Sequence, residues 1–405
     1  MTPNYSPAIC IIVENEPVPA DRRVWLEASA LVGAGYRVSI ICPKEGGCDS
    51  SAELLEGIEI YRYPAWNAQG IAGYIFEYSF ALVMQFYLAW KVYARNRFRI
   101  LLACNPPDTI FLIALAFKAM GVRFVFDHHD LCPELFESKF KRRGLIYGML
   151  CLLERLTFRA ADMSIATNES YLDIAVARGK MTPERVVVVQ TCAALSEVDG
   201  TQKIIELKRD KPYMVLYVGR MESQDGVALL IESIEYIVKQ KRREDARYVL
   251  IGSGSELAKL KTLASRMGVD NFVEFTGLLP HKEVCLYLSV ADVCVAPDPL
   301  SPLNDKSTMI KTLEYMAFSK PIVLFDLKEG RRTVGEGALY ARPDDPIDFA
   351  KQIEKLLDSE SLRRKLGEFG RKRTEEGLNW EAQSAKLVHA FETLIAEDPE
   401  SNRDK

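Results

Sequence analysis

Short apolar segments alternate with longer segments of helical periodicity along the chain, and this alternation runs twice. The first run opens with a predicted strand at residues 7–14, a helix at residues 22–34 and a second strand at residues 36–42. The pattern restarts with a predicted strand at residues 213–218, after a polar stretch without periodicity at residues 194–211. Strands that alternate with helices form parallel sheets with crossover helices. The sequence therefore predicts an α/β fold with two doubly wound domains.

The domain boundaries are predicted from the places where this pattern stops and restarts. Residues 1–195 are assigned to the first domain and residues 212–379 to the second. A final amphipathic helix, predicted at residues 380–397, is expected to cross back to the first domain. The 405 residues suffice for two domains with full cores.

Composition and charge exclude several classes of function. A net charge of −4 gives no general reason to expect a nucleic-acid partner. Nine cysteines without a Cys-x-x-Cys pair indicate reduced thiols in a cytoplasmic protein. Only four histidines are present, without the spacing of zinc ligands, so no metal site is predicted. The first residues lack the basic and apolar regions of a signal peptide.

Residues 301–316 stand out in the second half, because a polar loop there opens into a helix. Ser307 and Thr308 are good N-cap residues for a helix predicted at residues 309–318. The first turn of a helix presents backbone N–H groups and a positive dipole end, which suit a phosphate. The stretch is therefore a candidate phosphate site, although an ordinary capped helix gives the same pattern.

Charged residues and glycines add to this candidate site. Lys306 and Lys311 bring positive charge to the start of the helix, and Glu314 lies further along it, where it can reach a sugar hydroxyl. In parallel sheets, ligands bind outside the carboxyl ends of the strands. Glycine motifs, each weak by itself, follow three predicted strands of the second half: Gly219-Arg220, Gly252-Ser253-Gly254 and Gly277.

Polar clusters also lie at the corresponding edge of the first half. Arg22 and Arg23 open the first helix, where cations slightly oppose the helix dipole. This position suggests an anionic ligand, with solvated arginines as the alternative. Two histidines and two carboxylates follow a predicted strand, an active-site position in such sheets, with a buried structural histidine as the alternative. These residues are His128, His129, Asp130 and Glu134.

The chain resembles glycosyltransferase family 4 over nearly its whole length. In the second half the resemblance rests on Val218-Gly-Arg220, Gly252-Ser-Gly254, Phe275-Thr-Gly277 and the segment EYMAFSKPIV at residues 314–323. In the first half, PVPADRRVW at residues 17–25 and DHHDLCPE at residues 127–134 are similar to a bacterial subgroup that builds surface polysaccharides. The resemblance implies the GT-B fold, in which two Rossmann-like domains face a central cleft, and transfer that retains the anomeric configuration.

The resemblance also implies a substrate and roles for single residues. The donor would be a nucleotide-diphosphate sugar and the acceptor a hydroxyl of a glycan or lipid-linked molecule, with no metal or other cofactor. Departure of the diphosphate develops negative charge, which needs preorganised donors and cations. Arg220 matches the phosphate-binding arginine, Glu314 the ribose-binding acid and His129 the histidine that contacts the donor sugar. The implied catalytic residues are His129, Arg220, Lys311 and Glu314, the donor-binding residues are Gly219, Gly252, Ser253, Gly254, Gly277, Lys306, Ser307 and Thr308, and the acceptor contacts are Arg22, Arg23 and Glu134.

Two positions depart from the family pattern. Asp225 stands where the family usually has a lysine, and Lys306 stands where it usually has a glutamate. We hypothesise a relocation of charge, in which Lys306 lies beside the diphosphate and Asp305 takes part of the glutamate's role. Alternatively, Lys306 points to solvent and phosphate affinity is lower. A non-catalytic nucleotide- or glycan-binding scaffold derived from a GT-B enzyme therefore stays an alternative, as does a GT-B nucleotide-sugar epimerase.

A long aromatic helix is predicted at residues 71–94. Its charge-free part, residues 78–90, is shorter than the roughly 20 residues that span a bilayer. Aromatic and apolar side chains along one side suit peripheral contact with an anionic membrane, together with the basic residues Lys139, Lys141, Arg142 and Arg143. Packing of the helix inside the domain is the alternative. We expect a cytoplasmic location, either free or at the inner face of the cell membrane.

Overall fold

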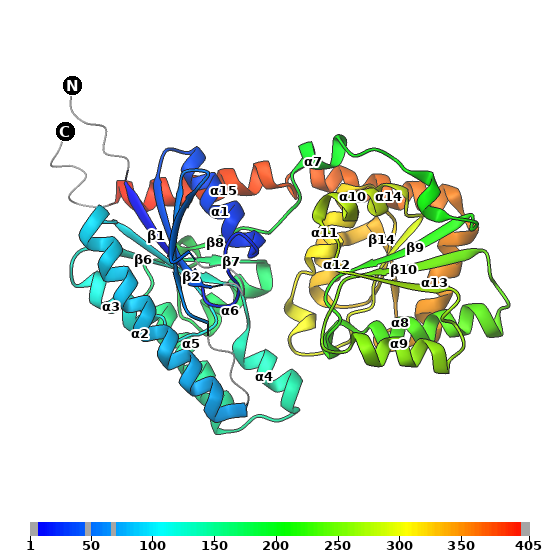
Figure 1. Ribbon diagram of the computed structural model, residues 1–405, viewed down its shortest axis with the longest axis horizontal. Helices are drawn as coiled ribbons and strands as arrows, with labels where there is room; N and C mark the ends of the chain where they lie inside the picture. Colours follow the sequence, from blue (N-terminus) through cyan, green and yellow to red (C-terminus); the bar gives the residue numbers. More distant parts are fainter. Residues whose placement is uncertain (1–6, 45–49, 66–69, 398–405) are drawn as a thin grey trace. The chain divides into compact units, whose positions relative to one another are not determined.

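The computed structural model of the protein describes residues 7–44, 50–65 and 70–397, and the chain divides into two compact units. Unit 1 comprises Met1–Gln190 and Ser384–Lys405, and unit 2 comprises Thr191–Gln383. Each unit contains a mainly parallel sheet with helices on both faces (Figure 1). The predicted α/β class with two doubly wound, Rossmann-like domains is therefore confirmed.

The sheet of unit 1 has eight strands in the order β3-β4-β2-β1-β5-β6-β7-β8. Neighbouring strands are parallel, except for the antiparallel pair β3 and β4 at one edge. The chain builds outwards from β1 and then returns to place β5 on its other side. Such a reversal of strand order opens a ligand crevice at the carboxyl ends of the two strands. The strands are β1 (Ala8–Ile12), β2 (Arg37–Pro43), β3 (Ala52–Leu55), β4 (Ile58–Tyr63), β5 (Ile100–Cys104), β6 (Arg123–His128), β7 (Met163–Ala166) and β8 (Val186–Val188).

Helices cover both faces of this sheet, and their ends follow local sequence signals. Asp21 caps the first helix, because its Oδ1 accepts the N–H of Val24 at 3.1 Å. The predicted aromatic helix forms as expected and packs on the next helix through Trp90, whose ring centroid lies 5.3 Å from that of Phe117. The helices are α1 (Arg22–Gly33), α2 (Gly70–Asn96), α3 (Phe111–Lys118), α4 (Cys132–Phe140), α5 (Leu145–Ala160), α6 (Glu169–Ala177) and the 3₁₀ turn η1 (Pro183–Arg185).

The sheet of unit 2 has six parallel strands in the order β11-β10-β9-β12-β13-β14. Its strand order reverses between β9 and β12, which defines the switch point of this unit. Alternate residues of β9 enter different cores: Val215 and Tyr217 lie in one buried cluster, and Met214 and Leu216 in the other. The strands are β9 (Tyr213–Val218), β10 (Ala246–Ile251), β11 (Val273–Gly277), β12 (Val293–Ala296), β13 (Ile322–Phe325) and β14 (Ala338–Ala341).

The two cores of unit 2 are closed by different helices. Leu230 of α8 and Phe349 of α13 pack in the cluster that contains Tyr217, whereas Leu288 of α10 packs in the other. The helices are α7 (Leu195–Asp199), η2 (Ile205–Lys208), η3 (Ser223–Asp225), α8 (Val227–Glu235), η4 (Tyr236–Gln240), α9 (Leu257–Arg266), α10 (His281–Val290), η5 (Asn304–Lys306), α11 (Ile310–Ala317), α12 (Lys328–Val334), η6 (Gly335–Gly337), α13 (Pro346–Asp358) and α14 (Glu360–Glu375).

The structural boundary between the units differs from the predicted linker. It falls between Gln190 and Thr191, and the polar stretch at residues 194–211 forms α7 and η2 inside unit 2. The reason is a set of polar contacts with α10 and its neighbours: Lys208 Nζ lies 2.7 Å from an Asp292 oxygen, and Ser289 Oγ donates to Gln202 O at 3.1 Å. A stretch without apolar periodicity is thus held by hydrogen bonds.

The last helix, α15 (Trp380–Ala396), belongs to both units. Its first N–H, on Trp380, donates to Ala193 O of unit 2 at 3.1 Å. From Ser384 onwards it lies in unit 1, where Arg185 Nη1 pairs with Glu397 Oε2 at 2.5 Å. The expectation that the C-terminal helix crosses back to the first domain is confirmed.

We expect Gly226→Ala to destabilise unit 2 strongly. Gly226 has a φ of 66°, and a Cβ there would lie 1.9 Å from Pro297 O. Backbone strain and overlap together should cost roughly 2–5 kcal/mol. Gly277→Ala is the matched control, because its φ of 76° adds strain but its Cβ would meet no atom within 4 Å. Thermal unfolding measures both variants, and equal losses would contradict the role of this close approach.

Candidate active site

Three glycine loops converge at the carboxyl edge of the unit 2 sheet. Gly219 N donates to Ile251 O at 3.0 Å, and Gly252 N donates to Gly277 O at 2.9 Å. Gly252 has a φ of 138°, and a Cβ there would lie 1.8 Å from Gly219 O. Only glycine permits this approach of two backbones. The structure thus brings together the three glycines that end β9, β10 and β11.

A reciprocal pair of hydrogen bonds fixes the next residues of these loops. Met221 N donates to Ser253 O at 3.0 Å, and Glu256 N donates to Met221 O at 3.0 Å. Gly254 lies against the same backbone, since its Cβ would meet Met221 O at 2.4 Å. Arg220 is held between these contacts: its carbonyl accepts the Tyr217 hydroxyl at 2.5 Å, and its side chain is exposed. The backbone of Arg220 is therefore fixed in position, while its side chain reaches the surface.

Lys311 lies at the same edge, in the first turn of α11. It is buried, and its Nζ lies 2.7 Å from Asp298 Oδ1 and 5.0 Å from the ring centroid of Tyr217. Asp298 follows β12, so the ion pair ties the start of α11 to the end of that strand, while the contact with Tyr217 of β9 crosses the switch point. An ammonium has three N–H donors. Lys311 can therefore bind a further anion while Asp298 keeps it in position.

Asp225 occupies the position where a lysine was expected, and it faces the same ammonium. Burial raises the pKa of Asp225, and the charge of Lys311 opposes this rise. Its Oδ2 also accepts the N–H of Glu222 at 2.9 Å, which closes the η3 turn. The second cation of the usual pattern is thus replaced by a carboxyl group with a local structural role.

The loop before α11 differs from its prediction. Ser307 and Thr308 do not cap the helix, which begins at Ile310 with Met309 as its N-cap residue. The Ser307 hydroxyl instead donates to Leu303 O at 2.9 Å, and Thr308 Oγ1 lies 3.3 Å from Thr333 Oγ1. The preceding residues Asn304–Lys306 form the 3₁₀ turn η5, and the helix begins after it at Ile310, one residue later than predicted.

Lys306 and Asp305 have partners within this region. Lys306 Nζ donates to Pro302 O at 3.2 Å, and Asp305 Oδ1 accepts the N–H of Lys328, the first residue of α12, at 2.9 Å. Asp305 is thereby engaged as a helix cap. Glu314 is buried on α11. The hypothesis of relocated charge stays a prediction, because these contacts place neither side chain against a phosphate.

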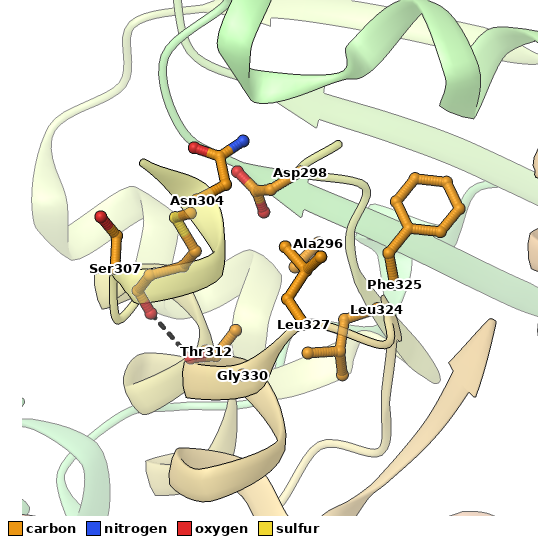
Figure 2. A pocket seen from close by; sticks show the side chains of 10 residues that line it. Ala296, Asp298, Asn304, Ser307, Thr312, Leu324, Phe325, Leu327 and Gly330 are labelled. Atoms are coloured by element: carbon orange, nitrogen blue, oxygen red, sulfur yellow. Dashed lines mark hydrogen bonds between the residues drawn. The ribbon is translucent and has the colours of Figure 1, made fainter. Parts of the chain in front are cut away.

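A small cavity of about 20 Å³ lies between the β12 end and α11 (Figure 2). Figure 2 shows Asp298 and Asn304 beside each other, above the apolar side chains of Leu324 and Leu327. Asp298 Oδ2 is buried and has no hydrogen-bond partner among the described residues. The cavity is large enough for one water molecule, which can satisfy such an atom.

In unit 1, His129 follows β6 and is oriented by a buried carboxylate. Its Nε2 lies 2.5 Å from Asp127 Oδ2, and its backbone N–H donates to Asn105 Oδ1 at 2.8 Å. Arg23 Nη2 donates to Asp127 Oδ1 at 2.8 Å, and Arg23 Nη1 donates to Val189 O at 2.8 Å. The histidine ring is therefore fixed by contacts from α1, β6 and the loop after β5.

Electrostatics keep the Asp127 carboxylate ionised. Burial alone would raise its pKa, but Arg23 and His129 hold the pKa of Asp127 below its ordinary value. Burial and the nearby Asp127 raise the pKa of Glu27 well above its ordinary value. Arg23 thus lies between two buried carboxyl groups, 2.8 Å from Asp127 Oδ1 and 3.1 Å from Glu27 Oε1, and the pKa of Asp127 is the one that is lowered.

Two predicted acceptor contacts have internal partners instead. Arg23 is buried against Asp127, so its position at the start of α1 reflects an internal counter-ion. Glu134 is also buried, and Arg178 binds both of its oxygens, at 2.9 and 3.1 Å. These contacts explain both positions by internal partners, and the acceptor assignments of the two residues stay predictions. Arg22 is half-buried, and its predicted acceptor contact stays a prediction.

Sequence reasoning missed three residues that build these sites. Asp298 directly follows the predicted strand at residues 293–296, so the strand-end rule would have found it. Tyr315 ties α11 to two strands, since its hydroxyl accepts the N–H of Val218 at 2.9 Å. Asp127 lies in a quoted motif, but its partner Arg23 is 104 residues away, and no local pattern reports that contact.

Thiols and metal ligands were also the subject of predictions. The eight described cysteines are free, and Cys48 lies outside the described residues. Cys104, Asp127 and His129 offer ligand atoms within 4.8 Å of one another. Arg23 occupies both oxygens of Asp127 in that cluster, which disfavours a cation there.

Among the described residues, no helix is both long and apolar enough to cross a membrane.

Comparisons with known proteins agree with this geometry. Residues 20–192 match the glycosyl transferase 4-like domain, and residues 199–373 match the glycosyl transferases group 1 domain. Alpha-D-kanosaminyltransferase of Streptomyces kanamyceticus is 25% identical over 224 residues, which cover 53% of this chain and 56% of that protein. The match therefore spans only about half the length of that relative.

Solved structures show the same fold over almost the whole chain. Sucrose-phosphate synthase of Thermosynechococcus elongatus superposes with a TM-score of 0.79 and 19% identity, covering 96% of this chain and 99% of that one. HepE of Anabaena, solved in complex with UDP, gives a TM-score of 0.70 and 14% identity, covering 96% and 100%. Two Rossmann-like units with paired sites at their strand ends define the GT-B glycosyltransferases. The two matched domains together place this chain in glycosyltransferase family 4.

We expect Asp127→Asn to destabilise unit 1 by roughly 3–5 kcal/mol, because it removes the carboxylate that accepts two N–H groups of the buried Arg23 and leaves only Glu27, whose pKa is raised, as an acidic neighbour. Glu397→Gln is the control, since it removes a half-exposed pair with Arg185 in the same unit and should cost less than about 1 kcal/mol. Thermal unfolding of the full chain checks both. A loss for Asp127→Asn no larger than that of the control would show that the pair does not support the fold.

Proposed function

We propose that the protein transfers a sugar from a nucleotide-diphosphate sugar to a hydroxyl of a glycan or lipid-linked acceptor, with retention of the anomeric configuration. The observation that carries this proposal is the arrangement of Arg220 and Lys311 at the switch point of unit 2. Lys311 lies in the first turn of α11 and over the ring of Tyr217, whose hydroxyl donates to the Arg220 carbonyl, so we infer that both cations and the helix N-terminus serve one phosphate site. A diphosphate that leaves there gains charge stabilisation in the transition state.

The donor site works through positions that the fold has already fixed. Gly219 and Gly252 remove the side chains that would otherwise separate a phosphate from the backbone. Lys311 exchanges part of its interaction with Asp298 for the incoming phosphate, and Arg220 can move its exposed side chain to the same group. Glu314, on the same helix, is the proposed ribose ligand. Lys306, Ser307 and Thr308 are the remaining proposed donor contacts, along the loop before α11.

His129 is the proposed contact to the donor sugar. His129 Nε2 lies within hydrogen-bond distance of both Asp127 Oδ2 and Arg23 Nε, so we propose that Nδ1 is the ring nitrogen that meets the donor sugar. Arg23 keeps that carboxylate charged and in place. We propose that no metal takes part, because Arg220, Lys311 and the helix N-terminus supply the positive charge that a leaving diphosphate requires.

Two features support a particular class of sugar donor and a particular biological role. HepE, which shares this fold, was solved with UDP, and a uridine diphosphate sugar is therefore the first donor class to examine. The segments at residues 17–25 and 127–134 resemble those of bacterial enzymes that build surface polysaccharides. We propose that role, at the cytoplasmic face of the cell membrane. A non-catalytic nucleotide-binding scaffold is the second candidate, favoured by Asp225 at the lysine position.

The first experiment measures the thermal shift of the purified protein with UDP, GDP, ADP, dTDP and CMP. We expect one diphosphate to raise the melting temperature, since a ligand at 100 times its Kd stabilises by about 2.7 kcal/mol. Arg220→Ala should reduce this shift, while Arg342→Ala, an equally exposed arginine of unit 2, should keep it. No shift with any nucleotide would reject the proposal. Nucleotide binding without sugar transfer to any glycan or lipid-linked acceptor would favour the scaffold.

Peripheral membrane contact is a further part of this proposal. Exposed apolar side chains lie on α2, α3 and α5, which pack beside one another in unit 1: Phe76, Val83, Phe86, Tyr87, Trp90, Leu112, Leu115, Leu145, Met149 and Leu152. The basic residues Lys139, Lys141, Arg142 and Arg143 precede α5 and are exposed. Exposed apolar area together with cations in the same unit suits an anionic bilayer surface.

We expect Val83→Ser/Tyr87→Ser to weaken binding to phosphatidylglycerol vesicles at least about threefold, because two exposed apolar groups no longer enter the interface. These side chains are 66% and 61% exposed, so folding should be unaffected. Leu278→Ser, at a 79% exposed position of unit 2, is the control. Vesicle cosedimentation measures the effect. Equal binding by all three proteins would remove this surface from the proposal.

A further inference from the structure

A cationic cavity lies in unit 1 at the edge of the sheet opposite His129. It encloses about 590 Å³ at the amino ends of β5, β6 and β7. The strands are parallel, so their amino ends lie far from the carboxyl edge that holds the candidate active site. Its polar lining consists of Tyr93, Arg97, Arg99, Lys118, Arg123 and Asp162.

Positive charge exceeds negative charge in this lining. Four cations face one carboxylate, which leaves a formal excess of three positive charges, although the whole chain carries −4. Asp162 is shared: its oxygens lie 2.7 Å from Lys118 Nζ and 3.6 Å from Arg123 Nη1, and one also accepts the N–H of Phe124. Among the described residues that line the cavity, one carboxylate therefore accompanies four cations. The cavity is therefore a site of locally positive potential.

Backbone contacts hold the arginines in fixed relative positions. Arg123 N donates to Arg99 O at 2.9 Å, and Arg99 N donates to Ala8 O at 2.9 Å, so both arginines continue the strand ladder. The Arg97 guanidinium stacks on Tyr93, 5.1 Å from its ring centroid. Tyr93 in turn packs against Phe98, at a centroid distance of 5.1 Å. The cations therefore converge on the cavity from a rigid aromatic floor.

We propose that this cavity binds a phosphate group, carried either by a phospholipid headgroup or by a free phosphorylated metabolite. Guanidinium groups bind phosphate oxygens through paired charge-assisted hydrogen bonds, and three arginines converge here. The volume lies in the range of small-molecule sites. The exposed side of α2 ends beside it, because Trp90 packs on Tyr93 at a centroid distance of 6.1 Å. The site is separate from the donor site and does not depend on the proposed sugar transfer.

The first arm of the test uses inorganic phosphate. Equilibrium dialysis with radiolabelled phosphate compares the full-length protein with Arg97→Gln/Arg99→Gln, which leaves the contacts of Asp162 intact. We expect the double variant to lose phosphate binding at this cavity at least about tenfold, as two charge-assisted donors are removed. Thermal unfolding of each protein reports independently that the variants are folded.

The matched control is Lys91→Gln/Arg95→Gln. It removes two exposed cations from α2, the helix that ends directly before Arg97, and neither residue lines the cavity. This control should keep the phosphate binding of the unmodified protein. If it loses as much as Arg97→Gln/Arg99→Gln, the effect is a general one of net charge and the proposal is overturned. Equal phosphate binding by all three proteins overturns it as well.

The second arm separates the two sources of phosphate. Vesicles of phosphatidylcholine with and without phosphatidylglycerol are sedimented with each protein. A loss of binding to the anionic vesicles in Arg97→Gln/Arg99→Gln, but not in the control, assigns the site to a lipid headgroup. Unchanged vesicle binding, with phosphate binding lost in the first arm, assigns it to a free phosphorylated compound.

Discussion

The approach of the Gly252 backbone to the carbonyl of Gly219 sets the geometry of unit 2. Any side chain at Gly252 would separate the loops that follow β9 and β10. Their contact lets Met221, Ser253 and Glu256 exchange backbone hydrogen bonds, and this exchange places Arg220 at the switch point. From the other side of the switch point, the ion pair of Lys311 with Asp298 brings in α11. One close backbone contact thus fixes the backbone of Arg220, and one ion pair fixes Lys311 at the start of α11.

In unit 1, a buried ion pair positions the candidate functional side chain. The pair is formed by Arg23 and Asp127, and it joins α1 to β6 across 104 positions of sequence. Removing either charge would leave the other buried, so both must be present. His129 takes its orientation from this pair and from Asn105. The two units therefore position their functional side chains differently: unit 2 by close backbone contact, and unit 1 by a buried carboxylate with three partners.

The architecture could be predicted from the sequence because it depends on the local periodicity of apolar residues. Alternating strands and helices, and glycines at strand ends, identify both sheets and their carboxyl edges. Contacts that depend on distant residues could not be predicted this way, as Arg23 and Glu134 demonstrate: both look like candidates for an outside ligand and both have an internal partner. Ser307 and Thr308 have the chemistry of helix caps, but α11 begins at Ile310 with Met309 as its N-cap residue. The polar stretch at residues 194–211 lacks periodicity and is nevertheless ordered by side-chain hydrogen bonds.

The path of α15 has a consequence for how the protein is made. Unit 1 takes its first 190 residues from the start of the chain and its last helix from beyond Ser384. During synthesis on the ribosome, domains generally begin to fold as they emerge. The sheet of unit 1 is complete when β8 has emerged, but the helical segment that pairs Glu397 with Arg185 arrives only after all of unit 2. The nascent chain must therefore carry an unfinished first domain throughout the translation of the second, with the surface meant for α15 open to chaperones.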